Sequence, residues 1–257
     1  MTATSTDNTG AQHFDLTEAT VRQLNHALHQ IGDVPAGGIR PEFVVDNPRG
    51  AHAVAAGLTA PVRVTINGSV GYYCAGMNQH ADVLINGNAG TGVAENIMSG
   101  KVRVTGNATM SAGATGHGGL VVIEGNAGAR CGISMKGVDI VVGGNVGHMS
   151  AFMAQAGNLV VLGDAGDDLG DSLYEARMFV RGNVASLGSD VEEKEMRPEH
   201  EQLLAGLLDR AGMSADPSEF RRYGSARNLY NFHIDDIDAE VAAKTGGSAA
   251  GTQGDRP

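Results

Sequence analysis

Short apolar runs rich in β-branched residues recur along the middle of the chain, and each precedes a glycine that lies nineteen residues after the previous one. The runs are too short for helices, and their Val and Ile residues favour strands. The Asn, Asp or Ser after each of these glycines is typical of a turn, in which we expect the glycines to adopt positive φ. The runs occupy residues 62–66, 82–85, 101–104, 120–123, 139–142, 158–162 and 177–180. The repeat glycines are Gly68, Gly87, Gly106, Gly125, Gly144, Gly163 and Gly182.

A nineteen-residue unit with one strand cannot bury its apolar face alone, but stacked units with parallel strands can. The pattern therefore predicts a mainly β fold, a right-handed parallel β-helix of seven coils over residues 62–189. We expect the mid-coil methionines Met77, Met98, Met135 and Met153 to fill its interior. Small residues before the strands indicate the corners of the coils: His80-Ala81, Gly100, Gly119, Gly137, Gly157 and Ala176.

Residues 13–61, before the repeats, are predicted to form a helical cap. Asp15 and Glu18 match a capping box, and apolar residues at helical spacing continue to Gly32. Asn47-Pro48 is expected to open a second, short helix that continues to Leu58. Both helices would cover the open end of the solenoid, where a coil edge is otherwise unpaired.

After the repeats, residues 190–240 are expected to form a helical and extended segment that contacts a partner. Residues 198–210 predict a charged helix ended by Gly212, and residues 220–230 are rich in arginine and aromatic residues. Residues 1–12 and residues 241–257 are rich in small and polar residues and are expected to be disordered.

Composition limits the classes of function. The 257 residues include 38 Gly, no Trp and only 4% aromatic residues, so the core must be thin and aliphatic. The formal net charge of -11 argues against nucleic acid or an anionic membrane as a partner. Cys74 and Cys131 form no CxxC site, and two buried reduced thiols are expected. Without a signal-peptide pattern or a spanning apolar stretch, the expected location is cytoplasmic.

Several local patterns could carry chemistry, but each has a simpler explanation. Residues 87–90 and 144–147 resemble phosphate loops, yet they recur in every coil and lead into no helix. The aspartate-rich residues 163–171 lack the spacing of a calcium loop. His80, His117 and His148 occupy different positions in their repeats, so they cannot form one metal site. We therefore predict no catalytic, cofactor-binding or metal-binding residue in this chain.

The repeated strand-Gly-Asn/Asp-Ala-Gly pattern from Gly68 to Gly188, preceded by Gly71-Tyr72-Tyr73-Cys74-Ala75-Gly76-Met77, resembles the GXGXG domain. This domain is the C-terminal β-helix of the glutamate synthase large subunit. With residues 223–232 included, the whole chain is most similar to the GXGXG subunit of N-methylglutamate synthase, methylamine-glutamate N-methyltransferase.

The resemblance implies a structural subunit without cofactors or catalytic residues of its own. Its partners would be a glutamine amidotransferase-like subunit and a synthase subunit that carries FMN and an iron-sulfur cluster. The chain would clamp both in a larger hetero-oligomer and help shape the ammonia or methylamine route between them. The nitrogen donor stays open. Alternatives are the GXGXG subunit of a glutamate synthase or of formylmethanofuran dehydrogenase, or an independent β-helix protein that acts on or binds carbohydrate.

Overall fold

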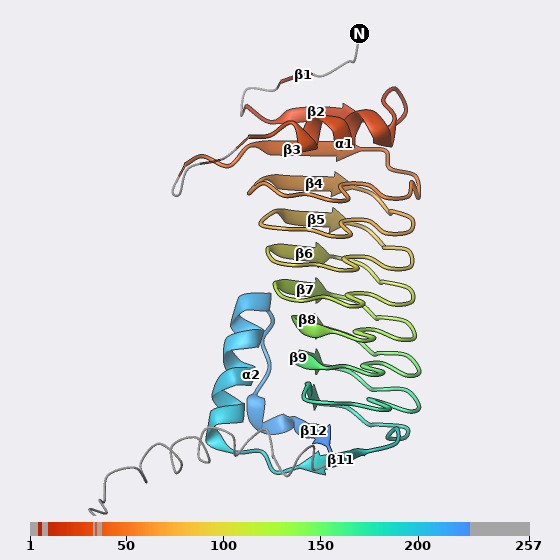
Figure 1. Ribbon diagram of the computed structural model, residues 1–257, viewed down its shortest axis with the longest axis vertical. Coiled ribbons are helices and arrows are strands. Elements are labelled where there is room, and N and C mark those ends of the chain that lie inside the picture. The colour runs from red at the N-terminus through yellow and green to blue at the C-terminus, as the bar shows by residue number, and fades with distance from the viewer. Residues whose placement is uncertain (1–4, 7–9, 33, 35–37, 227–257) are drawn as a thin grey trace, which may run out of the picture. The chain divides into compact units, whose positions relative to one another are not determined.

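The computed structural model describes residues 5–6, 10–32, 34 and 38–226 (Figure 1). The chain divides into two compact units, residues 1–225 and 226–257, and the fold described below is that of the first.

A ladder of parallel strands, each hydrogen-bonded to the next in sequence, forms one wall of the molecule (Figure 1). From Val64 onward the pairing advances by nineteen residues, with Val64 opposite Val83 and Val83 opposite Val102. This register confirms the predicted parallel β-solenoid. The strands are β2 (Gln12–Asp15), β3 (Glu42–Asp46), β4 (Arg63–Asn67), β5 (Asp82–Asn86), β6 (Lys101–Val104), β7 (Leu120–Ile123), β8 (Lys136–Val142), β9 (Ala156–Val161) and β10 (Arg177–Val180).

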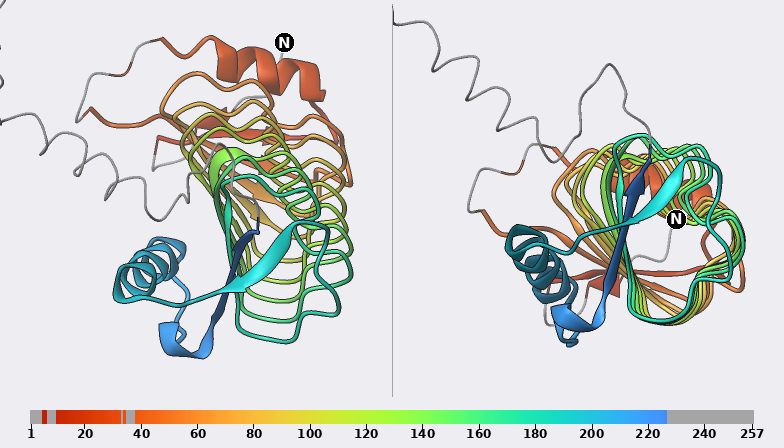
Figure 2. Two further views of the ribbon diagram at one scale, coloured as in Figure 1. Left: turned by 60° about the horizontal axis from the view of Figure 1, so that its bottom comes forward. Right: turned by 90° about the horizontal axis from the view of Figure 1, so that it is seen from below.

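The interior of the solenoid is filled with small and aliphatic side chains. Alternate strand residues such as Val83, Val102 and Ile140 point inward and are almost fully buried. Ala89 and Ala108 are also buried. They belong to a second column of parallel bridges, in which each coil pairs with the next. Seen along the axis, successive coils superimpose in outline (Figure 2). The interior is therefore a packed core.

The repeat glycines are required by close stacking, and the prediction that they adopt positive φ is wrong for all but Gly68. The Gly125 N–H donates to the Gly106 carbonyl at 3.0 Å. A Cβ on Gly125 would lie 2.5 Å from Asn107 Oδ1 and 2.8 Å from the Gly106 oxygen. No side chain fits between coils held this closely. Positive φ occurs instead at predicted corners such as Gly100 and Gly119, both at 84°.

A ladder of side-chain hydrogen bonds runs beside the glycine column. The backbone N–H of Asn126 donates to Asn107 Oδ1 at 2.8 Å, and the backbone N–H of Asn145 donates to Asn126 Oδ1 at the same distance. The ladder explains why Asn, Asp or Ser follows the glycines, because each side chain accepts the backbone N–H of the next coil. Its members are Ser69, Asn88, Asn107, Asn126, Asn145, Asp164 and Asn183.

The N-terminal flank differs from the predicted helical cap, because two strands of the ladder, β2 and β3, lie in or overlap residues 13–61. The described residues of this flank form one helix, α1 (Val21–His29), which begins after Thr20. Thr20 and Gln23 form the capping box. The Asp15 carboxylate instead accepts hydrogen bonds from Thr17 in the turn that follows β2. The predicted helix start at Asp15 is therefore wrong.

Helix α1 covers the end of the solenoid, as predicted. Leu24 and Leu28 are buried in the main core. The Asn25 side chain donates to the Ala53 carbonyl and accepts the Ala55 N–H, at 2.8 and 2.9 Å, so it pairs backbone groups at the coil edge.

The second predicted helix, from Asn47-Pro48 to Leu58, is not formed. Ala53 and Ala55 have positive φ, which ends any right-handed helix. The segment instead follows the course of a solenoid coil, and the Gly57 N–H donates to the Gly76 carbonyl.

The predicted disorder of residues 1–12 is wrong for two short stretches, β1 and the start of β2. Strand β1 (Ser5–Thr6) pairs antiparallel with β2, which begins at Gln12. Residues 1–4 and 7–9 lie outside the described part of the chain.

The C-terminal flank closes the other end. Strand β11 (Val191–Lys194) precedes helix α2 (Pro198–Ala211), which ends at Gly212 with φ 65°, as predicted. After a 3₁₀ turn (Pro217–Glu219), strand β12 (Arg221–Ser225) pairs antiparallel with β10 and β11. Residues 190–226 are thus helical and extended, and β12 covers the last strand of the ladder. Residues 227–240 and the predicted disordered tail, 241–257, lie outside the described residues.

The mid-coil methionines correct another prediction, because only Met135 of the four lies in the interior. Met77, Met98 and Met153 are 56%, 43% and 40% exposed. Met135 follows its repeat glycine by ten residues, an inward position, whereas the other three lie one residue earlier or later and face outward.

Replacing Gly125 with Ala should lower the free energy of unfolding by about 1–3 kcal/mol, because the new methyl group overlaps the preceding coil. Chemical denaturation measures this change. Gly206→Ala is the control: Gly206 lies in α2, and a Cβ added there would meet no atom within 4 Å apart from the backbone of its own helix, so this change should be neutral or stabilise by about 0.5–1 kcal/mol. Equal stability of Gly125→Ala and the wild type would refute the close-stacking explanation.

Candidate functional site

Within the part of the chain that the structure describes, the outer face of the strand ladder is covered only over its C-terminal half. Helix α2 lies beside β7 to β10 (Figure 1) and forms a second apolar core with them. This helix therefore occupies the C-terminal half of what would otherwise be an exposed apolar sheet face. The core contains Leu120, Val122, Val141, Val160, Leu162 and Phe179 from the ladder, and Leu204, Leu207, Leu208, Ala211 and Phe220 from the C-terminal flank.

Two cations on β6 mark the end of the covered region. Lys101 Nζ donates to the Arg210 carbonyl at 3.1 Å, and Arg103 Nη1 donates to the Ala211 carbonyl at 2.6 Å. These carbonyls belong to the last turn of α2, where positive charge is favourable. Burial and the nearby Arg103 lower the pKa of Lys101. Helix α2 is thus held where the open part of the face begins.

Over β4 to β6 the outer face is not covered by any described residue, and charged side chains such as Arg63, Asp82 and Lys101 line it. A shallow groove of about 270 Å³ runs along it, lined by residues that include Thr65, Leu84 and Arg103. Its border carries the ion pairs Arg63–Glu42 and Arg40–Asp82, between partly exposed side chains. Exposed pairs of this kind contribute little to folding stability. We call this region, over β4 to β6, the open strand face.

A larger hollow of about 680 Å³ adjoins the open strand face beside Ala60, His80 and Gly100. Residues 33 and 35–37, which neighbour its lining residue Val34, lie outside the described residues, and we assign the hollow no role.

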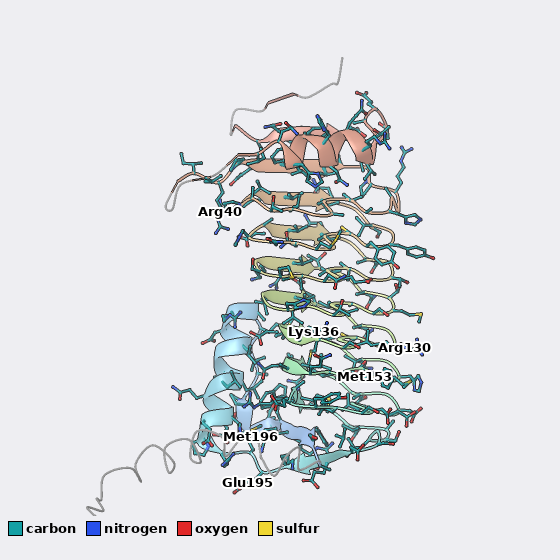
Figure 3. The ribbon with its side chains drawn as sticks, in the orientation of Figure 1. Arg40, Arg130, Lys136, Met153, Glu195 and Met196 are labelled. Atoms are coloured by element: carbon teal, nitrogen blue, oxygen red, sulfur yellow. The ribbon has the colours of Figure 1, made fainter. Side chains whose placement is uncertain are left out.

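The wall opposite the strands is formed by the turn segments of the coils, which we call the turn arms (Figure 1). Among the described residues, these arms contain most of the large exposed apolar side chains. Met153 lies on these arms, away from the strands (Figure 3). Sequence reasoning missed this surface because it assigned the methionines to the interior. Their position relative to the repeat glycine, compared with that of Met135, was the available signal. The exposed residues on these arms are Tyr72, Tyr73, Met77, Met98, Met110, Met153 and Tyr174.

The phosphate-loop candidates cannot offer free backbone donors at residues 144–147. The N–H groups of Gly144 and Gly147 donate to carbonyls of the preceding coil, and that of Val146 donates to the Asp164 carbonyl. The Asn145 N–H is taken by the asparagine ladder. Residues 87–90 occupy the equivalent place, and the N–H groups of Asn88, Ala89 and Gly90 are likewise used. A bound phosphate would have to break the stacking of the coils.

The other candidate ligands are not brought together. In residues 163–171, Asp164 and Asp171 accept backbone N–H groups from Asn183 and Ser189, respectively. His148 lies 3.6 Å from Asp168, and His80 lies 3.3 Å from the Ser99 hydroxyl, one coil away. Throughout the described ranges, no group of three or more His, Cys, Asp or Glu side chains is placed to hold a metal ion.

Both cysteines are free and fully buried, as predicted. Burial raises the pKa of the Cys74 thiol and of the Cys131 thiol to about 12. At neutral pH both remain protonated, and a protonated thiol is a poor nucleophile and a poor metal ligand. The two cysteines therefore act as core residues.

A parallel β-solenoid built on a glycine column, with two dissimilar uncovered walls, defines a protein of the GXGXG β-helix class. No family model matches the chain. The chain is 63% identical over 227 residues to Protein GlxC of Rhizobium meliloti (strain 1021), an alignment that covers 88% of this chain and 98% of the relative. The chain belongs to this family, the glutamate-synthase-like GXGXG subunits. Among the described residues, no helix is long and apolar enough to cross a membrane.

The native protein should leave both thiols unreacted with Ellman's reagent at pH 8, because thiols with a pKa of about 12 are neutral and shielded at that pH. Absorbance of the released thiolate measures the reaction. In denaturing urea, which serves as the control, both thiols should react quickly. Rapid reaction of either thiol in the native protein would contradict the buried placement of that residue.

Proposed function

We propose that this chain is the non-catalytic structural subunit of a split glutamate-synthase-like flavoenzyme, specifically of an N-methylglutamate synthase. In this proposal it bridges a glutamine amidotransferase-like subunit and a subunit that carries FMN and an iron-sulfur cluster. Family membership supports the proposal. The observation that carries it is the pair of uncovered walls, the open strand face and the turn arms of residues 71–79, 90–98 and 109–117, on opposite sides of one rigid solenoid.

The packed core limits how such a subunit could shape a nitrogen route. A Cβ built on Gly113 or Gly116 would lie less than 3 Å from the side chain of Ile140 or Val138, respectively. The interior is close-packed at these two positions, which disfavours a path for ammonia or methylamine through the core of the solenoid. The proposed route therefore runs along an outer wall, between this chain and a partner that excludes water.

Affinity purification of the tagged full-length chain from its native host tests the bridging role. We expect both an amidotransferase-like subunit and an FMN-bearing subunit to co-purify, with flavin detected by its absorbance. Assays of the purified complex with methylamine and with glutamine then identify the nitrogen donor. A chain that elutes as a clean monomer and binds polysaccharide would overturn the proposal.

Removal of this subunit tests the route. A complex reconstituted without the chain should lose nitrogen intermediate to solvent, measured as free ammonia or methylamine per product formed. The complete complex is the control. If the complex without the chain releases no more free ammonia or methylamine per product than the complete complex does, a role in the route is contradicted. Only a role in assembly would then be left.

A further inference from the structure

Five of the large exposed apolar side chains gather on three consecutive coils. They come from the turn arms of residues 71–79, 90–98 and 109–117, and each is about half exposed. We call this set the turn-wall patch; it consists of Tyr72, Tyr73, Met77, Met98 and Met110.

The turn-wall patch is almost free of charge in a strongly acidic protein. Its three arms contain one Asp, Glu, Lys or Arg residue, Glu95, although the chain average of 18% would place about five there. Burial raises the pKa of Glu95, which further disfavours its charged form. Tyrosine and methionine enrichment with charge depletion is the composition of an interface core.

The backbone of the patch and the Tyr72 ring are also held in place before any partner binds. The Tyr72 ring stacks on His52 with 4.6 Å between ring centroids, and the Tyr72 N–H donates to His52 Nδ1. The N–H groups of Tyr73 and Met77 donate to carbonyls of the next coil at 2.9 and 2.7 Å. The held backbone and the stacked Tyr72 ring lose little conformational entropy on association.

We propose that the turn-wall patch binds an uncharged, apolar face of a partner subunit, and this inference rests on the bridging function proposed above. Electrostatic repulsion distinguishes between the possible binding partners of the patch. A second copy of the chain would bring together two proteins of net charge -11, which repel each other. An anionic membrane surface is repelled for the same reason. An uncharged face of a different subunit meets neither obstacle.

Met77→Lys tests the proposal against a matched control, Met153→Lys. The two methionines hold the same position in their repeats, with φ of 56° and 52°, and both are exposed, but Met153 lies four coils from Met77 and outside the patch. Met77→Lys should weaken binding of the partner subunit about tenfold or more. Met153→Lys should leave binding within about twofold. Equal effects of the two changes would overturn the assignment. Circular dichroism melting checks that both variants fold.

Methionine oxidation locates the surface without any mutation. Hydrogen peroxide oxidises exposed methionines, and mass spectrometry measures the sulfoxide at each one. From the free full-length chain to the native complex, oxidation of Met77, Met98 and Met110 should slow about tenfold, while Met153 keeps its rate. Buried Met135 should stay slow in both. Unprotected Met77, Met98 and Met110 in an intact complex would overturn this inference and leave the bridging function standing.

Two further outcomes separate failure of the proposed function from failure of the surface assignment. If no partner subunit co-purifies, the proposed function fails and this inference fails with it. If the chain alone sediments as a dimer that Met77→Lys dissociates, the occupant is a second copy, and the assignment to a partner subunit is overturned.

Discussion

The stacking of each coil on the one before it, at the glycine and asparagine columns, is the constraint on which the rest of the structure depends. The N–H of each repeat glycine from Gly106 to Gly182 meets the carbonyl of the repeat glycine in the preceding coil, and the neighbouring Asn side chain accepts the next N–H. Neither contact tolerates an inserted residue or an added Cβ. The nineteen-residue period is therefore strict wherever these columns run, and the coils must be nearly identical in outline.

The start of the ladder shows what happens without these columns. Phe14 pairs with Val45, and Val45 pairs with Ile66, steps of 31 and 21 residues. The asparagine ladder begins only at Ser69, so nothing holds the earlier steps to nineteen residues. The longer first step accommodates α1, which covers the end of the core. Strand β12 closes the other end by antiparallel pairing, so neither end of the ladder leaves a parallel strand unpaired.

The interior of the solenoid is packed in the same way in every coil, so only the side chains on the outer surface can differ from coil to coil. Helix α2 divides the strand side into a covered apolar half and an open half lined by charged side chains, and Lys101 and Arg103 fix the border. The turn side is apolar and nearly uncharged over three coils and bears more charge beyond them. Two unlike walls on one rigid body suit a subunit that works by contact with others.

Much of this protein could be predicted from its sequence alone. The parallel ladder from β4 to β10, its period, the buried thiols and the end of α2 at Gly212 follow from local patterns that repeat in the chain or punctuate it. The family resemblance also follows from the repeat. These features are encoded locally, because each strand, turn and cap depends on a few adjacent residues.

Only the tertiary structure decided the rest, because it depends on neighbours distant in sequence. Strands β2 and β3 pair outside the nineteen-residue period, so no repeat reveals them. The need for Gly125 comes from Asn107 and Gly106 in the preceding coil, and not from its own φ. Met77 and Met135 are adjacent in repeat position yet lie on opposite sides of the coil wall, one exposed and one buried. A shift of one residue along a tightly wound coil reverses the direction of a side chain, and only the closed coil shows which way each one points.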